Sequence, residues 1–126
     1  MVIHESAEDY LESILILQQQ NGSVHSIDIV NQLGYSKPSV SIAMKKLRQS
    51  GYISMAADGE ITLNETGLEV ATRIYRRHRV ITRLFQQLGV PEEQAAIDAC
   101  KVEHDLSQET FERICEFVER SGGKTE

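Results

Sequence analysis

Hydrophobic residues recur every three or four positions along most of this chain, which is the spacing of amphipathic helices. Glycines and polar capping residues interrupt this pattern and divide it into separate segments. The pattern predicts helices over residues 6–21, 26–33, 36–50, 66–88, 91–104 and 107–118. We therefore expect a mainly helical protein.

One segment departs from the helical spacing. Residues 52–55 and 61–63 are short runs of β-prone residues, and an Asp-Gly pair at 58–59 lies between them. Such a pair between two short runs is a strong signal for a β-hairpin. Helix, short helix, glycine-containing turn, helix and hairpin follow one another as in a winged helix-turn-helix. The predicted fold class is therefore mainly α with a small β-hairpin wing.

Charge is distributed unevenly along the 126 residues. The net charge is −6, and residues 92–126 carry all of it, with ten acidic and four basic side chains. Residues 29–51 hold four basic side chains and no acidic one. A basic stretch in the predicted helix-turn-helix suits an anionic partner such as DNA, whereas an acidic region suits a cation. Ordinary solvated helix faces would also explain these clusters.

The helix predicted over residues 36–50 is the one that would enter the major groove of DNA. In helix-turn-helix proteins the N-terminal residues of this helix reach base edges, and residues further along contact phosphates. The predicted base contacts are Ser36, Lys37, Pro38, Ser39 and Ser41, and the predicted phosphate contacts are Lys45 and Lys46. A three-helix core with an incidental hairpin is the competing interpretation.

Six side chains form a candidate metal site. They are Asp9, Glu12, His78, Cys100, Glu103 and His104. The last three stand at i, i+3 and i+4, and the first two at i and i+3, so each set shares one face of its predicted helix. Oxygen-rich ligation with imidazoles suits manganese and ferrous ions, whereas a thiolate favours iron, zinc or cobalt. Each residue also fits an ordinary role, such as a buried thiol for Cys100 or a phosphate contact for His78.

Three segments of the sequence resemble the diphtheria-toxin-repressor family of metal-dependent transcriptional regulators. They are SAEDYLE at 6–12, RRHR at 76–79 and CKVEHDLS at 100–107. The segments SKPSVS at 36–41 and LNETG at 63–67 match as well. The resemblance is strongest to the manganese transport regulator branch and covers nearly the whole chain.

This resemblance implies a metal-switched regulator of transcription. It implies a winged helix-turn-helix DNA-binding domain over residues 1–70 and a helical dimerisation and metal-binding domain over residues 71–126. It also implies a homodimer that binds a palindromic operator in double-stranded DNA when a divalent cation is bound. Repression of metal-uptake genes is the expected outcome.

The resemblance also indicates which metal ion the site takes. The residues that match ligands of the manganese branch are Asp9, Glu12, His78, Glu103 and His104. The iron branch has methionine at the position of Asp9, and a carboxylate is the harder ligand, which favours manganese. Cys100 departs from this pattern, because the manganese branch has a carboxylate there and the iron branch has cysteine. Thr82 and Ala96 replace the Glu and His of the iron branch's ancillary site, so that second site is not expected. Manganese is therefore expected first and iron(II) next, with zinc or cobalt as ions that bind in vitro.

Several other classes of protein are disfavoured. The chain shows no glycine-rich phosphate loop or nucleophile elbow, so an enzyme is not expected. It has no apolar run of the roughly 20 residues that span a bilayer and no signal-peptide pattern, so we expect a cytoplasmic protein without a membrane partner. The alternative function is a metal-independent winged-helix regulator that responds to a small ligand or to the redox state of Cys100.

Overall fold

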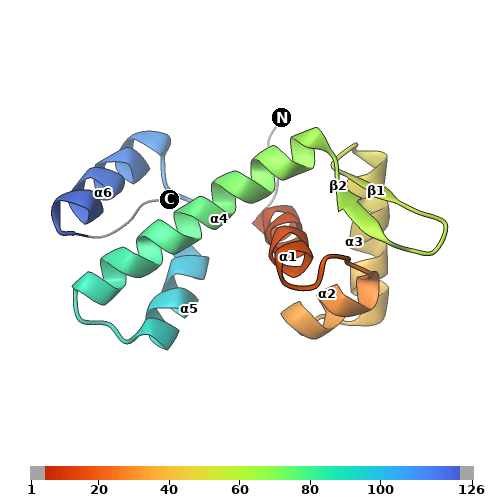
Figure 1. Cartoon of the computed structure of the whole chain (residues 1–126), viewed down its shortest axis with the longest axis horizontal. Helices are drawn as coiled ribbons and strands as arrows, with labels where there is room; N and C mark the ends of the chain where they lie inside the picture. The colour runs from red at the N-terminus through yellow and green to blue at the C-terminus, as the bar shows by residue number, and fades with distance from the viewer. Residues whose placement is uncertain (1–4, 123–126) are drawn as a thin grey trace. The chain divides into compact units, whose positions relative to one another are not determined.

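The computed structural model describes residues 5–122, which form six helices and one β-hairpin (Figure 1). In chain order the elements are α1 (Glu5–Asn21), α2 (Ser26–Leu33), α3 (Lys37–Gln49), β1 (Ile53–Met55), β2 (Ile61–Leu63), α4 (Glu65–Gln87), α5 (Glu92–Val102) and α6 (Gln108–Arg120). The chain divides into an N-terminal unit, residues 1–72, and a C-terminal unit, residues 73–126, and the division falls within α4. The predicted fold class, mainly α with a small hairpin wing, is confirmed.

The core of the N-terminal unit forms where α1, α2, α3 and the hairpin meet. α1 packs on α2 and α2 packs on α3, while β2 contacts α1 and β1 contacts α3. The fully buried apolar side chains include Leu11 and Ile14 from α1, Ile29 from α2, Val40 from α3 and Ile53 from β1. Burial of these side chains supplies most of the driving force that holds α3 against the rest of the unit.

The wing is a two-stranded antiparallel sheet in which Ile53 pairs with Leu63. Its turn closes with a hydrogen bond from the Gly59 N–H to the Ala56 carbonyl oxygen at 2.9 Å. Gly59 has a φ of +90°, a conformation that residues with a Cβ rarely adopt. The Asp-Gly pair therefore marks the turn, as the sequence predicts.

Asn64 and Gly67 join the wing to the start of α4. The Asn64 N–H donates to the carbonyl oxygen of Tyr52 at 2.9 Å, and Asn64 Nδ2 donates to that of Gly51 at 3.1 Å. Ser54 Oγ donates to Asn64 Oδ1 at 2.7 Å. Gly67 comes so close to the hairpin that a Cβ on it would overlap the carbonyl oxygen of Tyr52. The junction therefore requires glycine at this position.

The C-terminal unit has a small core of its own between α4 and α6. Its members are Val80, Phe111, Cys115 and Val118, with Leu84 and Ile114 packed against them. Ser107 caps α6, because its Oγ accepts a hydrogen bond from the Thr110 N–H at 3.1 Å. The thiol of Cys115 is buried, which assigns it to packing.

The predicted helices agree with the observed ones to within two residues at every end that the structure describes. The C-terminal end of α5 differs from the prediction in a way that affects the candidate metal site. The sequence predicts that this helix continues to His104, whereas it ends at Val102. None of the helices within residues 5–122 combines the length and the apolar composition that crossing a bilayer requires.

Candidate metal and DNA sites

The first turn of α3 presents a polar, exposed surface. Ser36 caps the helix: its Oγ accepts from the Ser39 N–H at 3.3 Å and donates to Ser39 Oγ at 2.8 Å. Val40, Met44 and Leu47 face the core, so the opposite side of the helix is left to solvent. The structure places all seven predicted DNA contacts at exposed positions, namely Ser36, Lys37, Pro38, Ser39, Ser41, Lys45 and Lys46.

The exposed side of α3 has only basic charges among the residues described. The helix holds Lys37, Lys45, Lys46 and Arg48 and no acidic side chain. Such a surface attracts phosphates, and the N-terminus of a helix adds a favourable dipole for them.

Two exposed hydrophobic residues beside this surface were missed by the sequence analysis. Ile42 on α3 is 58% exposed and directly follows Ser41. Tyr35, in the turn before α3, is 42% exposed, and its ring contacts that of Tyr10 edge-on with 5.7 Å between centroids. Burial raises the pKa of Tyr10, and the phenol of Tyr35 raises it further. The spacing of hydrophobic residues in α3 could have predicted that Ile42 is exposed. The helix buries Val40, Met44 and Leu47, which stand at i, i+4 and i+7, and Ile42 falls outside this series.

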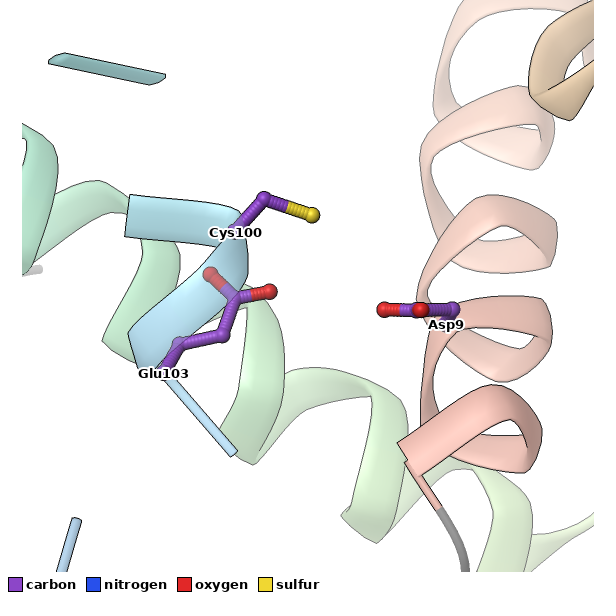
Figure 2. Close-up of side chains that lie close together, drawn as sticks. All are labelled: Asp9, Cys100 and Glu103. Atoms are coloured by element: carbon purple, nitrogen blue, oxygen red, sulfur yellow. The ribbon is translucent and has the colours of Figure 1, made fainter. Parts of the chain in front are cut away.

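Asp9 and Glu12 are the two candidate ligands of the N-terminal unit. Both lie on α1, three residues apart, so their side chains leave the same face of the helix. Asp9 is half-buried and Glu12 is buried. Figure 2 shows the carboxylate of Asp9 projecting from α1.

Glu103 is the centre of the candidate ligands in the C-terminal unit. Its side chain is 0% exposed, and its Oε2 lies 2.8 Å from Nδ1 of His78. Its other oxygen, Oε1, lies 3.6 Å from Nε2 of His104 and accepts no hydrogen bond from the part of the chain that the structure describes. The Sγ of Cys100 and a carboxylate oxygen of Glu103 lie within 4.8 Å of one another. Figure 2 shows both of these side chains at the end of α5.

His104 does not share a helix face with Cys100 and Glu103, which corrects the prediction from spacing. Glu103 is the C-cap of α5, and His104 lies in the turn that follows. The turn still brings the imidazole of His104 to the carboxylate of Glu103. Cys100, Glu103 and His104 are therefore gathered by the end of α5 and not by a continuous helix, and His78 joins them from α4.

The donor set in the C-terminal unit fits a divalent transition metal ion. It combines one thiol, one carboxylate and two imidazoles, the ligand types that such ions bind in proteins. A buried carboxylate oxygen without a hydrogen bond is costly unless a cation or donor compensates it, and Glu103 Oε1 is such an atom among the described residues. The interpretation of Cys100 as a buried thiol is wrong, since Cys100 is exposed. The imidazole of His78 contacts a carboxylate, which disfavours its interpretation as a phosphate contact.

Thr82 and Ala96 stand where the iron branch has the Glu and His of its ancillary metal site. Thr82 Oγ1 donates to the main-chain oxygen of His78 at 2.6 Å, so its hydroxyl serves the helix. Ala96 has no donor atom in its side chain.

A winged helix-turn-helix with a basic reading helix, followed in the same chain by a helical unit with a thiol, carboxylate and imidazole cluster, defines a metal-dependent DNA-binding regulator of transcription. Two family models match the chain: "Iron dependent repressor, N-terminal DNA binding domain" over residues 3–60, and "Iron dependent repressor, metal binding and dimerisation domain" over residues 64–121. The chain belongs to the iron-dependent repressor family. The family resemblance predicted from the sequence is thereby confirmed.

Similar proteins include regulators of transcription from an archaeon and a bacterium. An uncharacterised HTH-type transcriptional regulator of Methanocaldococcus jannaschii is 36% identical over 118 residues, which cover 92% of this chain and 94% of that protein. The transcriptional regulator MntR of Salmonella typhimurium is 32% identical over 97% of this chain and 78% of its own length. Both relatives are named as regulators of transcription.

Solved structures show the same fold. IdeR of T. acidophilum superposes with a TM-score of 0.81 at 28% identity, over 97% of this chain and 55% of its own. The manganese regulator SloR superposes with a TM-score of 0.78 at 27% identity, over 94% of this chain and 55% of its own. The chain thus spans about half the length of these two proteins.

Proposed function

We propose that this chain is a repressor of metal-uptake genes that binds a palindromic operator as a homodimer when a divalent cation is bound. The reading surface is the exposed side of α3, with Ser36 to Ser41 at base edges and Lys45 and Lys46 at phosphates. Dimerisation belongs to the C-terminal unit, in keeping with the family model that matches there. We further propose that residues 1–70 and 71–126 are the functional domains.

The proposed ligands come from both units. They are Asp9, Glu12, His78, Cys100, Glu103 and His104. Manganese is the first candidate and iron(II) the second, because carboxylates and imidazoles outnumber the single thiol. SloR is described as a manganese regulator and IdeR of Mycobacterium bovis as an iron-dependent repressor, which supports both candidates. Zinc or cobalt would bind in vitro, and the related ScaR has been solved with zinc and with cadmium.

The pairing of Glu103 with His78 is the observation that carries the proposal. A carboxylate only accepts hydrogen bonds, so the 2.8 Å contact requires that Nδ1 of His78 carries the proton. This tautomer leaves Nε2 as the ring nitrogen that can bind a metal, an arrangement common to metal-ligating histidines. Glu103 would then orient His78 through Oε2 and hold the ion through Oε1.

The proposed switch is a shift toward the DNA-binding state when a cation is bound, and it follows from the positions of the proposed ligands in the chain. Asp9 and Glu12 lie on α1, which packs against the helix-turn-helix, whereas Glu103 lies in the C-terminal unit. When bound, the ion supplies the positive charge that offsets these three carboxylates. An ion at a hundred times its dissociation constant for the DNA-binding state contributes about 2.7 kcal/mol toward that state. This amount lies within the usual range of allosteric coupling.

Operator binding measured across metals tests the proposal. An operator is selected from random duplexes, and its affinity is measured with manganese, anaerobic iron(II), zinc, cobalt or a chelator. We expect affinity about 100-fold higher with manganese than with chelator. Glu103→Ala should lose this difference, while the matched variant Glu93→Ala, on the exposed first turn of α5, should keep it. Equal operator affinity with metal and with chelator would refute the metal switch and favour the metal-independent regulator.

A further inference from the structure

The guanidinium of Arg77 joins α4 to the segment that carries two of the proposed ligands. Arg77 Nη1 donates to the main-chain oxygens of Glu103 at 3.2 Å and Leu106 at 2.7 Å. Its Nη2 donates to Oε1 of Gln108 at 3.1 Å. All three acceptors lie 26 to 31 residues further along the chain and within the C-terminal unit. One side chain therefore closes the loop between α4 and the α5–α6 connection.

Arg77 is only 5% exposed, so its contacts are made away from bulk water. A buried charge is costly unless donors and acceptors compensate it, and here main-chain carbonyls and an amide do so. The guanidinium also lies 5.2 Å from the centroid of the Phe111 ring, close enough for a cation–π contact. A planar group with a fixed fork of donors is needed to reach three acceptors, which a lysine ammonium cannot match.

The contact with Glu103 coincides with the end of α5. The helix stops at Val102, and the next carbonyl, that of Glu103, accepts from Arg77 instead of continuing the helical pattern. The side chain of the same residue meets His78, the neighbour of Arg77 in α4. Glu103 is thus fixed at its main chain by one α4 residue and at its carboxylate by the next.

We infer that Arg77 is a positioning residue for the metal site: it sets the main chain at residues 103–106, and thereby the placement of the carboxylate of Glu103 and the imidazole of His104. The inference rests on the proposed function, because it assigns Arg77 a role toward that same site. Arg77 contacts the proposed ligand Glu103 through the main chain and is not itself a ligand.

Metal titration of the full chain tests the role of Arg77. Manganese affinity is measured by calorimetry, and the ligand field is read from the visible absorption bands of bound cobalt. Loss of a group that orients metal ligands typically weakens binding by about 10–100-fold, so we expect that loss and altered cobalt bands for Arg77→Met. The manganese affinity of Arg77→Lys should lie between that of Arg77→Met and that of the wild type, because lysine keeps the positive charge but lacks the planar set of N–H donors.

Two controls separate positioning from general stability. Arg76→Met removes an exposed arginine that lies at the same 5.2 Å from the Phe111 ring, and its affinity should stay within about twofold of wild type. Val118→Ala opens the core of the same unit, so it should lower the melting temperature while leaving the cobalt bands unchanged.

The outcomes distinguish this inference from the proposed function. A folded Arg77→Met protein with wild-type affinity and wild-type cobalt bands would overturn the inference alone. A wild-type chain that binds neither ion would overturn both. If Arg77→Met does not fold, Arg77→Lys carries the test: weaker manganese binding with altered cobalt bands supports the inference, and wild-type affinity with wild-type bands refutes it.

Discussion

Replacing Gly67 with alanine sets two opposing effects against each other at the junction of wing and α4. Gly67 lies in the first turn of α4, and alanine is favoured over glycine inside a helix by about 1 kcal/mol. The added Cβ would overlap the main-chain oxygen of Tyr52. A main-chain atom cannot rotate away as a side chain would, so the hairpin and the helix must move apart.

That movement weakens the hydrogen bonds of Asn64, which holds the same junction. Its N–H, its Nδ2 and its Oδ1 bond to Tyr52, Gly51 and Ser54 at 2.9, 3.1 and 2.7 Å. At about 1 kcal/mol each, three such bonds outweigh the helical gain, so the net loss is about 2 kcal/mol. For a unit of this size the melting temperature should fall by about 8–16 °C.

Thermal unfolding followed by circular dichroism measures the effect. The matched variant Thr66→Ala changes the exposed neighbouring residue of the same turn and should alter stability by less than about 0.5 kcal/mol. A Gly67→Ala protein that is as stable as wild type, or more stable, would show that helix propensity dominates and that the close approach to Tyr52 is not tight. Operator affinity should fall together with stability, since the wing and α3 share one core.

Two further substitutions address the reading helix and the choice of metal. Ile42→Ser should weaken operator binding by roughly fivefold and abolish any preference for thymine over deoxyuridine in the operator, because an exposed apolar side chain can contact the thymine methyl. Leu68→Ser, at an α4 residue that is 46% exposed, is its control, and an undiminished thymine preference in Ile42→Ser would contradict this role. Cys100→Asp should shift the ratio of manganese to cobalt affinity toward manganese by about tenfold, as measured by competition titration, since a carboxylate is harder than a thiolate. Cys115→Ala, in the core, should leave that ratio unchanged, and an unchanged ratio in Cys100→Asp would remove the thiol from the ligand set.

The N-terminal unit was predictable because its signals are local. Gly34 ends α2 with a φ of +74°, Ser36 caps α3, and Gly59 shapes the hairpin turn. Each of these residues acts on its immediate neighbours, so the sequence alone contains the relevant information. The exposure of Ile42 was harder to foresee, because a hydrophobic residue on a short helix is more often buried.

The C-terminal unit shows where local patterns stop being informative. Spacing alone grouped Cys100, Glu103 and His104 on one helix face, but the helix ends before His104. The interaction at that end comes from Arg77, which is 26 residues away from Glu103 in the sequence. A run of arginines in a helix suggests a solvated or phosphate-binding face, and nothing in it distinguishes the buried member.

The early end of α5 also explains how one carboxylate can serve two purposes. With its main-chain oxygen held by Arg77, Glu103 turns into the interior of the unit and becomes fully buried. Its Oε2 accepts from His78, which fixes the tautomer of that imidazole. Of the two carboxylate oxygens of Glu103, Oε1 is the one that lacks a hydrogen bond within the described residues, so a cation bound there would offset the buried charge. The main chain of Glu103 still follows the helix, since its N–H donates to the carbonyl oxygen of Ala99 at 3.0 Å, so Arg77 holds the residue at the point where α5 ends and its carboxylate is buried.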